Sequence, residues 1–162
     1  MLVIKVEEIA DKYKGYEVDE EKLKEFLIPP KSRTVWDLKV GNKYYFIDDA
    51  QGIIESIWVN ETIDINRRNF GNCFLTRKDA EFEVMRRKVE TTLLKYGRRE
   101  FKPRQNNYCL VYDSINKEIE ESCYVEYNIQ VFIYFDTKEL LNHAINAAGE
   151  DNIKKYIFGV KN

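Results

Sequence analysis

Two groups of carboxylates could hold a divalent cation or carry out acid–base chemistry. Asp48 and Asp49 follow one aromatic run, and Glu118, Glu120 and Glu121 lie in a later one. The first pair lies in a predicted hairpin turn, where aspartates commonly accept backbone N–H groups. The glutamates lie in a predicted strand and are typical of its solvent-exposed face. We therefore interpret both groups as turn and surface residues and assign no catalytic residue.

The other common ligands and nucleophiles are sparse. His143 is the single histidine and lies in a predicted helix, so a catalytic triad or a histidine-based metal site would depend on it alone. Cys73, Cys109 and Cys123 lack C-x-x-C spacing. Cys109 and Cys123 could face each other across a predicted hairpin, but no second ligand pair accompanies them. Glycine-rich phosphate loops are also missing. We expect free thiols, no metal, no cofactor and no enzymatic activity.

Basic residues gather between residues 86 and 104, although the whole chain has a formal net charge of −2. We predict a basic binding patch there, consisting of Arg86, Arg87, Lys88, Lys95, Arg98, Arg99, Lys102 and Arg104. Arg67 and Arg68 lie just upstream and could extend it. A basic helix followed by a basic linker, as expected for this segment, can contact phosphate groups. The same charges can instead be neutralised inside the molecule or keep the helix soluble, and the sequence leaves both readings open.

The following segment has the opposite charge. Lys117 is the only basic residue between residues 113 and 126, so this segment is acidic. We predict a second binding surface at Glu118, Glu120 and Glu121. The tyrosines of the aromatic runs could stack on nucleic-acid bases. Tyrosines that alternate on half-buried strands are more typical of cross-strand pairs.

Two segments follow one order of elements: strand, turn, strand, loop, a strand that ends in Phe-x-Thr, and a helix. The first spans about residues 43–97 and the second about 107–149. Tyr44 aligns with Tyr108 and Phe74 with Phe135. The pattern predicts an α+β fold with two degenerate β-β-β-α repeats and a largely antiparallel sheet.

The helices after the two Phe-x-Thr motifs have clear start signals. Thr76 and Thr137 are predicted N-caps, and Asp79 completes a capping box with Thr76. The first helix should run to about Tyr96 with a buried stripe of Phe82, Met85, Val89, Leu93 and Tyr96. The second should end at Gly149 with a buried stripe of Leu140, Leu141, Ala144, Ile145 and Ala148. Asp151 is the predicted cap of a last short helix.

Residues 1–35 read as an N-terminal extension with a helix that Asp19 caps and Pro29 ends. Residues 36–162 read as a single α+β domain, long enough to form one hydrophobic core. The segment between Trp58 and Asn72 is polar and reads as a loop. No apolar run reaches the roughly 20 residues of a membrane span, and the N-terminus lacks a signal peptide. We expect a cytoplasmic protein of the host cell without a membrane partner.

Three stretches carry a family resemblance: WDLKVGNKYYFI at residues 36–47, RRNFGNCFLTRKDAEF at residues 67–82 and GEDNIKKYIFGV at residues 149–160. In these stretches the chain resembles a family of small proteins encoded by phages and prophages of low-GC Gram-positive bacteria. The resemblance covers most of residues 36–160 and implies an accessory gene of a mobile element. It implies no catalytic residues.

These observations favour a non-catalytic, phage-encoded protein that binds a host or defence protein or nucleoprotein. Anti-CRISPR inhibitors are one kind of protein in that setting. The alternative is a nucleic-acid-binding accessory protein of phage replication or recombination that uses the basic patch. The amphipathic helices also leave a homodimer open.

Overall fold

The computed structural model describes residues 12, 14–16, 33–126 and 133–160. The chain divides into two units, residues 1–33 and 34–162. In the first unit only Lys12, residues 14–16 and Arg33 are described, so the predicted helix with Asp19 and Pro29 lies outside the described residues. Within the described part of the chain, no helix is both long enough and apolar enough to cross a bilayer.

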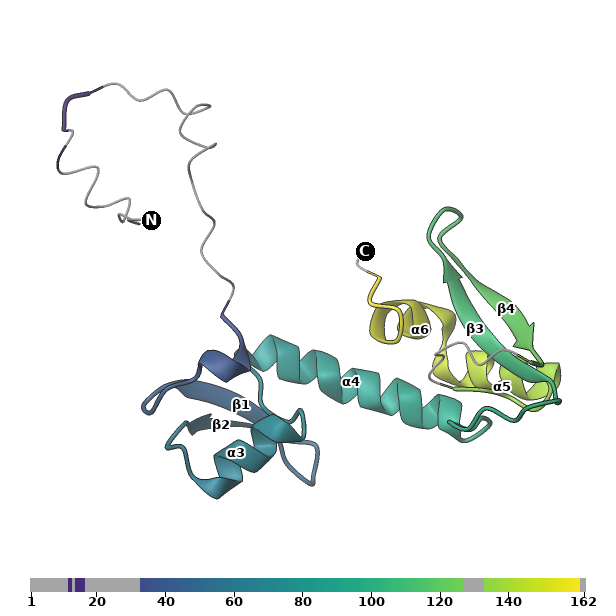
Figure 1. Ribbon diagram of the computed structural model, residues 1–162, viewed down its shortest axis with the longest axis horizontal. Coiled ribbons are helices and arrows are strands. Elements are labelled where there is room, and N and C mark those ends of the chain that lie inside the picture. Colours follow the sequence, from purple (N-terminus) through teal and green to yellow (C-terminus); the bar gives the residue numbers. More distant parts are fainter. Residues whose placement is uncertain (1–11, 13, 17–32, 127–132, 161–162) are drawn as a thin grey trace. The chain divides into compact units, whose positions relative to one another are not determined.

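The second unit is a mixed α/β structure with two antiparallel hairpins (Figure 1). Its elements are η1 (Val35–Asp37), β1 (Lys43–Ile47), β2 (Ile53–Ile57), α3 (Thr62–Asn69), α4 (Arg77–Leu94), β3 (Asn107–Asp113), β4 (Glu118–Tyr124), α5 (Lys138–Ala148) and α6 (Glu150–Tyr156). Each hairpin forms its own two-stranded sheet, with β1 paired to β2 and β3 paired to β4. The predicted mixture of helices and antiparallel strands is confirmed.

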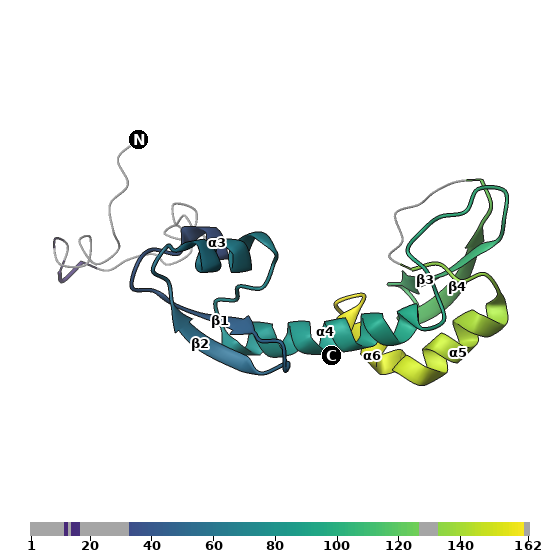
Figure 2. The same cartoon turned by 90° about the horizontal axis from the view of Figure 1, so that it is seen from below.

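The first hairpin has a helix on each face. Side chains alternate along a strand, so Tyr44 and Phe46 share one face of β1 while Tyr45 and Ile47 share the other. The hydroxyl of Tyr44 donates to Asp64 of α3 at 2.6 Å, so the first face meets α3 (Figure 2). α4 contacts β1 and β2, and its Arg77 lies over the ring of Tyr45 on the second face.

Helix α3 occupies part of the segment that we expected to be a loop, so that expectation is wrong. Its sequence, TIDINRRN, buries only Asp64 and not an apolar stripe. Asp64 accepts hydrogen bonds from Tyr44 Oη and from Val59 N, and Arg67 donates to Tyr44 Oη at 2.8 Å. The two apolar residues of α3, Ile63 and Ile65, are two positions apart and not three or four, so hydrophobic spacing did not reveal the helix.

The N-caps of α4 and α5 agree with the predictions. Thr76 Oγ1 accepts from Asp79 N and Thr137 accepts from Leu140 N, while the Asp79 carboxylate accepts from the Thr76 hydroxyl and not, as in a capping box, from its backbone N–H. Gly149 follows α5 with a φ of 81°. Gly149, and not Asp151, is the N-cap of α6, because that helix begins at Glu150 directly after the glycine.

The buried face of α4 differs in part from the predicted stripe. Val89 and Leu93 are buried as expected, joined by Ala80 and Glu90. Phe82 is 40% exposed, with its ring 5.2 Å from that of Tyr156. The predicted buried stripe of α5 agrees better with the structure, since Leu141, Ala144 and Ala148 are buried.

Buried residues of the described chain form two clusters, whereas the length led us to expect one core. The first cluster comprises Leu38, Tyr44, Trp58 and Cys73, beside the β1–β2 hairpin and α3. The second comprises Val89, Leu93, Leu110, Ile133, Phe135, Leu141, Ala144, Ala148 and Ile153. α4 contributes to the second cluster and also contacts the first hairpin, so it packs against both halves of the second unit.

Gly97 packs too closely for any side chain, which gives a first testable prediction. A Cβ atom there would lie 2.5 Å from Ile133 Cγ2 and 2.9 Å from the backbone oxygen of Tyr134. Because Ile133 and Tyr134 are buried, they have little room to move away. We expect Gly97→Ala to lower the free energy of unfolding by about 1–3 kcal/mol. Urea denaturation followed by circular dichroism measures this, and an unchanged midpoint would contradict the packing.

Candidate functional site

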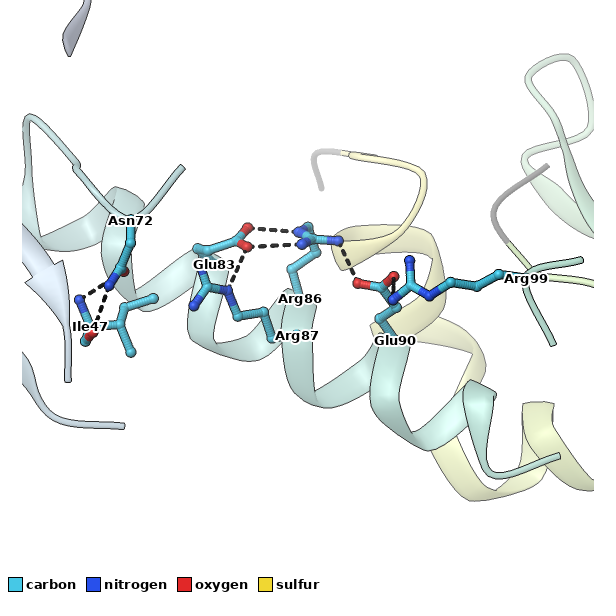
Figure 3. Close-up of polar contacts among 7 residues, drawn as sticks. All are labelled: Ile47, Asn72, Glu83, Arg86, Arg87, Glu90 and Arg99. Atoms are coloured by element: carbon cyan, nitrogen blue, oxygen red, sulfur yellow. Dashed lines mark hydrogen bonds and ion pairs between the residues drawn. The ribbon is translucent and has the colours of Figure 1, made fainter. Parts of the chain in front are cut away.

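Most residues of the predicted basic patch form ion pairs with carboxylates of the same molecule. Arg86 donates to Glu83 Oε2 at 2.6 Å and to Glu90 Oε2 at 2.9 Å (Figure 3). Arg87 Nε donates to Glu83 at 2.8 Å, and Arg99 donates to the buried Glu90 at 2.7 Å. Glu83 lies just before the predicted patch, so a charge count that starts at Arg86 misses it.

The electrostatics of this network support the pairing. Burial disfavours the charged form of Glu83, but hydrogen bonds from Arg86 and Arg87 outweigh it and lower the pKa of this carboxyl. The hydrogen bond to Glu83 raises the pKa of Arg86 in turn. Both groups are therefore fully charged at neutral pH and occupied by each other.

Arg98 and Lys102 are also paired, across a long stretch of sequence. Both donate to Asp136 Oδ1, Arg98 at 2.9 Å and Lys102 at 3.3 Å, and the pKa of Asp136 is lowered, chiefly by the Arg98 hydrogen bond. Arg98 Nη2 also donates to the side chain of Asn107, and Nη1 contacts the backbone oxygen of Glu100. Arg98 is thus a structural residue.

Three members of the predicted patch, Lys88, Lys95 and Arg104, form no ion pair with the described residues. Lys88 lies on the exposed side of α4, Lys95 is the exposed C-cap of that helix, and Arg104 lies in the loop before β3. Arg67 and Arg68 do not extend the patch, because Arg67 lies over the ring of Phe46 at 3.4 Å and Arg68 lies between two tryptophans. The structure therefore does not gather the eight residues into one free cationic surface.

The predicted acidic surface lies on β4. Glu118 and Glu120 are exposed, opposite Asp113 and Val111 of β3. Glu121 forms an ion pair with Lys138 at 2.9 Å, which raises the pKa of that lysine. One of the three glutamates is therefore engaged in an ion pair, while the other two remain exposed.

The other candidate groups are dispersed. Asp48 Oδ1 accepts from Gly52 N at 2.6 Å and so closes the β1–β2 turn. Exposed His143 stacks on Tyr96, with ring centroids 6.3 Å apart. Among the residues that the structure describes, no three histidine, cysteine, aspartate or glutamate side chains come together as a metal site would require.

Cysteine burial gives a second prediction. Cys109 lies opposite Ser122 and Cys123 opposite Tyr108, so the two thiols do not face each other as we considered. Cys73 and Cys109 are buried, which raises the pKa of each thiol to about 11, whereas Cys123 is exposed.

Because the thiolate is the reactive form, we expect one rapid equivalent with Ellman's reagent at pH 8 and the other two only after denaturation. Cys123→Ser should abolish the rapid phase. Rapid reaction of all three thiols in the native protein would contradict the burial of Cys73 and Cys109.

The sequence did not reveal that several large apolar side chains near the first hairpin and α3 are exposed. They are Trp36, Val40, Ile57, Val59, Ile63 and Phe70, which we call the apolar surface. Trp36 shares the Arg68 guanidinium with the buried Trp58, and Val40 precedes Gly41, whose N–H donates to Trp58 O. Ile57 pairs with Lys43 and so lies on the face of the hairpin that Tyr45 shares. No periodic pattern marks these residues, because they come from a turn, a strand and the overlooked helix α3.

Trp36 is the most firmly positioned member of the apolar surface. It lies in η1, where Thr34 and Asp37 form a capping box with bonds in both directions. The Arg68 guanidinium lies 4.7 Å from the Trp36 ring and 4.8 Å from the Trp58 ring. The indole is thus held in place although it is 63% exposed. Such an aromatic loses little conformational entropy when it is buried by a partner.

Comparison with protein-family models, with curated proteins and with solved structures finds no match to this chain.

Proposed function

We propose that the protein is a non-catalytic binding protein of a phage or prophage that docks on a host or defence protein in the host cytoplasm. An anti-CRISPR-like inhibitor is one form of this function. The observation that carries the proposal is the apolar surface, in which Phe70 is 82% and Trp36 63% exposed. The phage setting is the one that the sequence resemblance over most of residues 36–160 implies.

The chemistry of the apolar surface favours a protein partner. Contiguous exposed apolar side chains commonly mark protein interaction sites. Tryptophan is enriched among the few interface residues that carry most of the binding free energy, and an indole held before binding has a lower ordering cost. Trp36 has both properties.

The ion pairs weigh against the alternative, a nucleic-acid interface along the predicted basic patch. Phosphate binding there would require Arg86 to exchange its carboxylate partners at 2.6 and 2.9 Å for phosphates, while Arg87 and Arg99 each already give one nitrogen to a carboxylate. Arg98 would have to leave Asp136 and Asn107. Each exchange reduces the net gain from a phosphate contact.

We also propose that the second unit arose by duplication of a β-β-β-α segment. Supporting this, Tyr45 bridges to Phe74 in the first segment as Tyr108 bridges to Phe135 in the second, although this makes Tyr45, and not Tyr44, the counterpart of Tyr108. Each phenylalanine lies two residues before the threonine that caps the next helix. The first segment carries α3 before its bridge, and α3 supplies Ile63 and, at its end, Phe70. Residues 127–132, at the corresponding place, lie outside the described residues.

Quantitative affinity capture from lysate of a low-GC Gram-positive host tests the proposed function. The full chain is compared with Trp36→Ala, Phe70→Ala and the control Ile115→Ala, whose side chain is 88% exposed but lies in the β3–β4 turn. We expect a host protein that wild type and the control enrich equally and that the other two variants lose. Equal capture by all four proteins would contradict the proposal.

A further inference from the structure

A groove of about 460 Å³ lies between the β1–β2 turn and α4. It is lined by Ile47, Asp48, Gln51, Val84, Arg87, Lys88, Thr91, Thr92 and Lys95. The groove is on the α4 side of the first hairpin, whereas α3 and its apolar residues are on the other side. Its volume is within the range of small-molecule sites.

The cations of this groove are largely unoccupied. Lys88 and Lys95 form no ion pair within the described part of the chain, and both are exposed. Arg87 uses Nε for Glu83, while its terminal nitrogens have no hydrogen-bond partner among the described residues. Asp48 is the one acidic residue in the lining, and one of its oxygens already accepts from Gly52 N. The groove therefore has a positive excess.

The spacing of the lining residues along α4 places donors on one face. Lys88, Thr91 and Lys95 are three and four residues apart, so their side chains lie next to one another on the helix surface. Ammonium, guanidinium and hydroxyl donors together are the groups that bind phosphate oxygens. Ile47 and Val84 add apolar atoms to the same groove.

We propose that this groove binds a small phosphorylated ligand of nucleotide size. The phosphates lie against Arg87, Lys88 and Lys95, and an uncharged ring packs on Ile47 and Val84. This inference goes beyond the proposed docking function and uses none of the residues of the apolar surface, so either proposal can fail without the other.

The test is a titration of the ¹⁵N-labelled full chain with ADP, followed by backbone amide shifts in NMR spectra. We expect saturable shifts at Gln51, Val84 and Thr91. Lys88→Glu should weaken binding about tenfold, because a charge-assisted contact is lost. Lys78→Glu is the matched control, since it makes the same charge change at an exposed position of the same helix outside the groove. It should leave binding within about twofold of wild type.

Three results would overturn the inference. One is the absence of shifts at millimolar ADP. Another is equal weakening by Lys88→Glu and Lys78→Glu, which would indicate general charge attraction. The third is tighter binding of a single-stranded DNA oligonucleotide than of ADP, with shifts of amides well outside the groove. The site would then be part of a nucleic-acid interface.

Discussion

Replacement of Asn107 by alanine is expected to lower the free energy of unfolding by about 3 kcal/mol and the Tm by about 6–12 °C. Asn107 is completely buried. Its Oδ1 accepts from Arg98 Nη2 and Lys102 N, both at 2.9 Å. Its Nδ2 lies within 3.0 Å of the backbone oxygens of Lys102, Gln105 and Tyr124. Alanine leaves these groups without partners in a site that excludes water.

The neighbouring residue provides the control for this experiment. Asn106 is exposed, and Asn106→Ala should change the Tm by less than about 1 °C. Thermal unfolding followed by circular dichroism compares the two variants directly. Equal and small effects would show that the Asn107 amide does not organise the loop between α4 and β3.

The elements with local signals were predictable from the sequence. The strand pairs expected near residues 43–49 and 53–58 appear as β1 and β2, and those near 107–113 and 118–124 as β3 and β4. Threonine caps and apolar spacing located α4 and α5 because both signals act within a few residues. Short-range sequence signals thus predict the hairpins and the long helices of the fold.

What could not be predicted depends on contacts between distant residues. Helix α3 packs through Asp64, whose partner Tyr44 lies 20 residues away. Arg98 meets Asp136 across 38 residues, and this pair removes a cation from the predicted patch. A sequence shows how many charges a segment carries but not which are paired in the fold. For the same reason it did not show which apolar residues remain exposed near the first hairpin and α3.

Replacement of Trp36 by alanine should have the largest effect on partner binding. A preorganised tryptophan at an interface is expected to contribute about 2 kcal/mol or more, which corresponds to about 30-fold in Kd. Stability should fall by less than about 1 kcal/mol, because the side chain is mostly exposed and loses mainly its cation–π contact with Arg68. Thermal unfolding of the variant separates a loss of binding from a loss of fold.

Isothermal titration calorimetry with the captured partner tests most directly whether the apolar surface, and not the predicted basic patch, recognises it. Trp36→Ala, Arg99→Ala and Ile115→Ala are each titrated at two salt concentrations. We predict that Trp36→Ala weakens binding about 30-fold at either salt concentration, while the other two variants stay within about threefold of wild type. Wild-type affinity in Trp36→Ala, together with salt-sensitive loss in Arg99→Ala, would contradict this account.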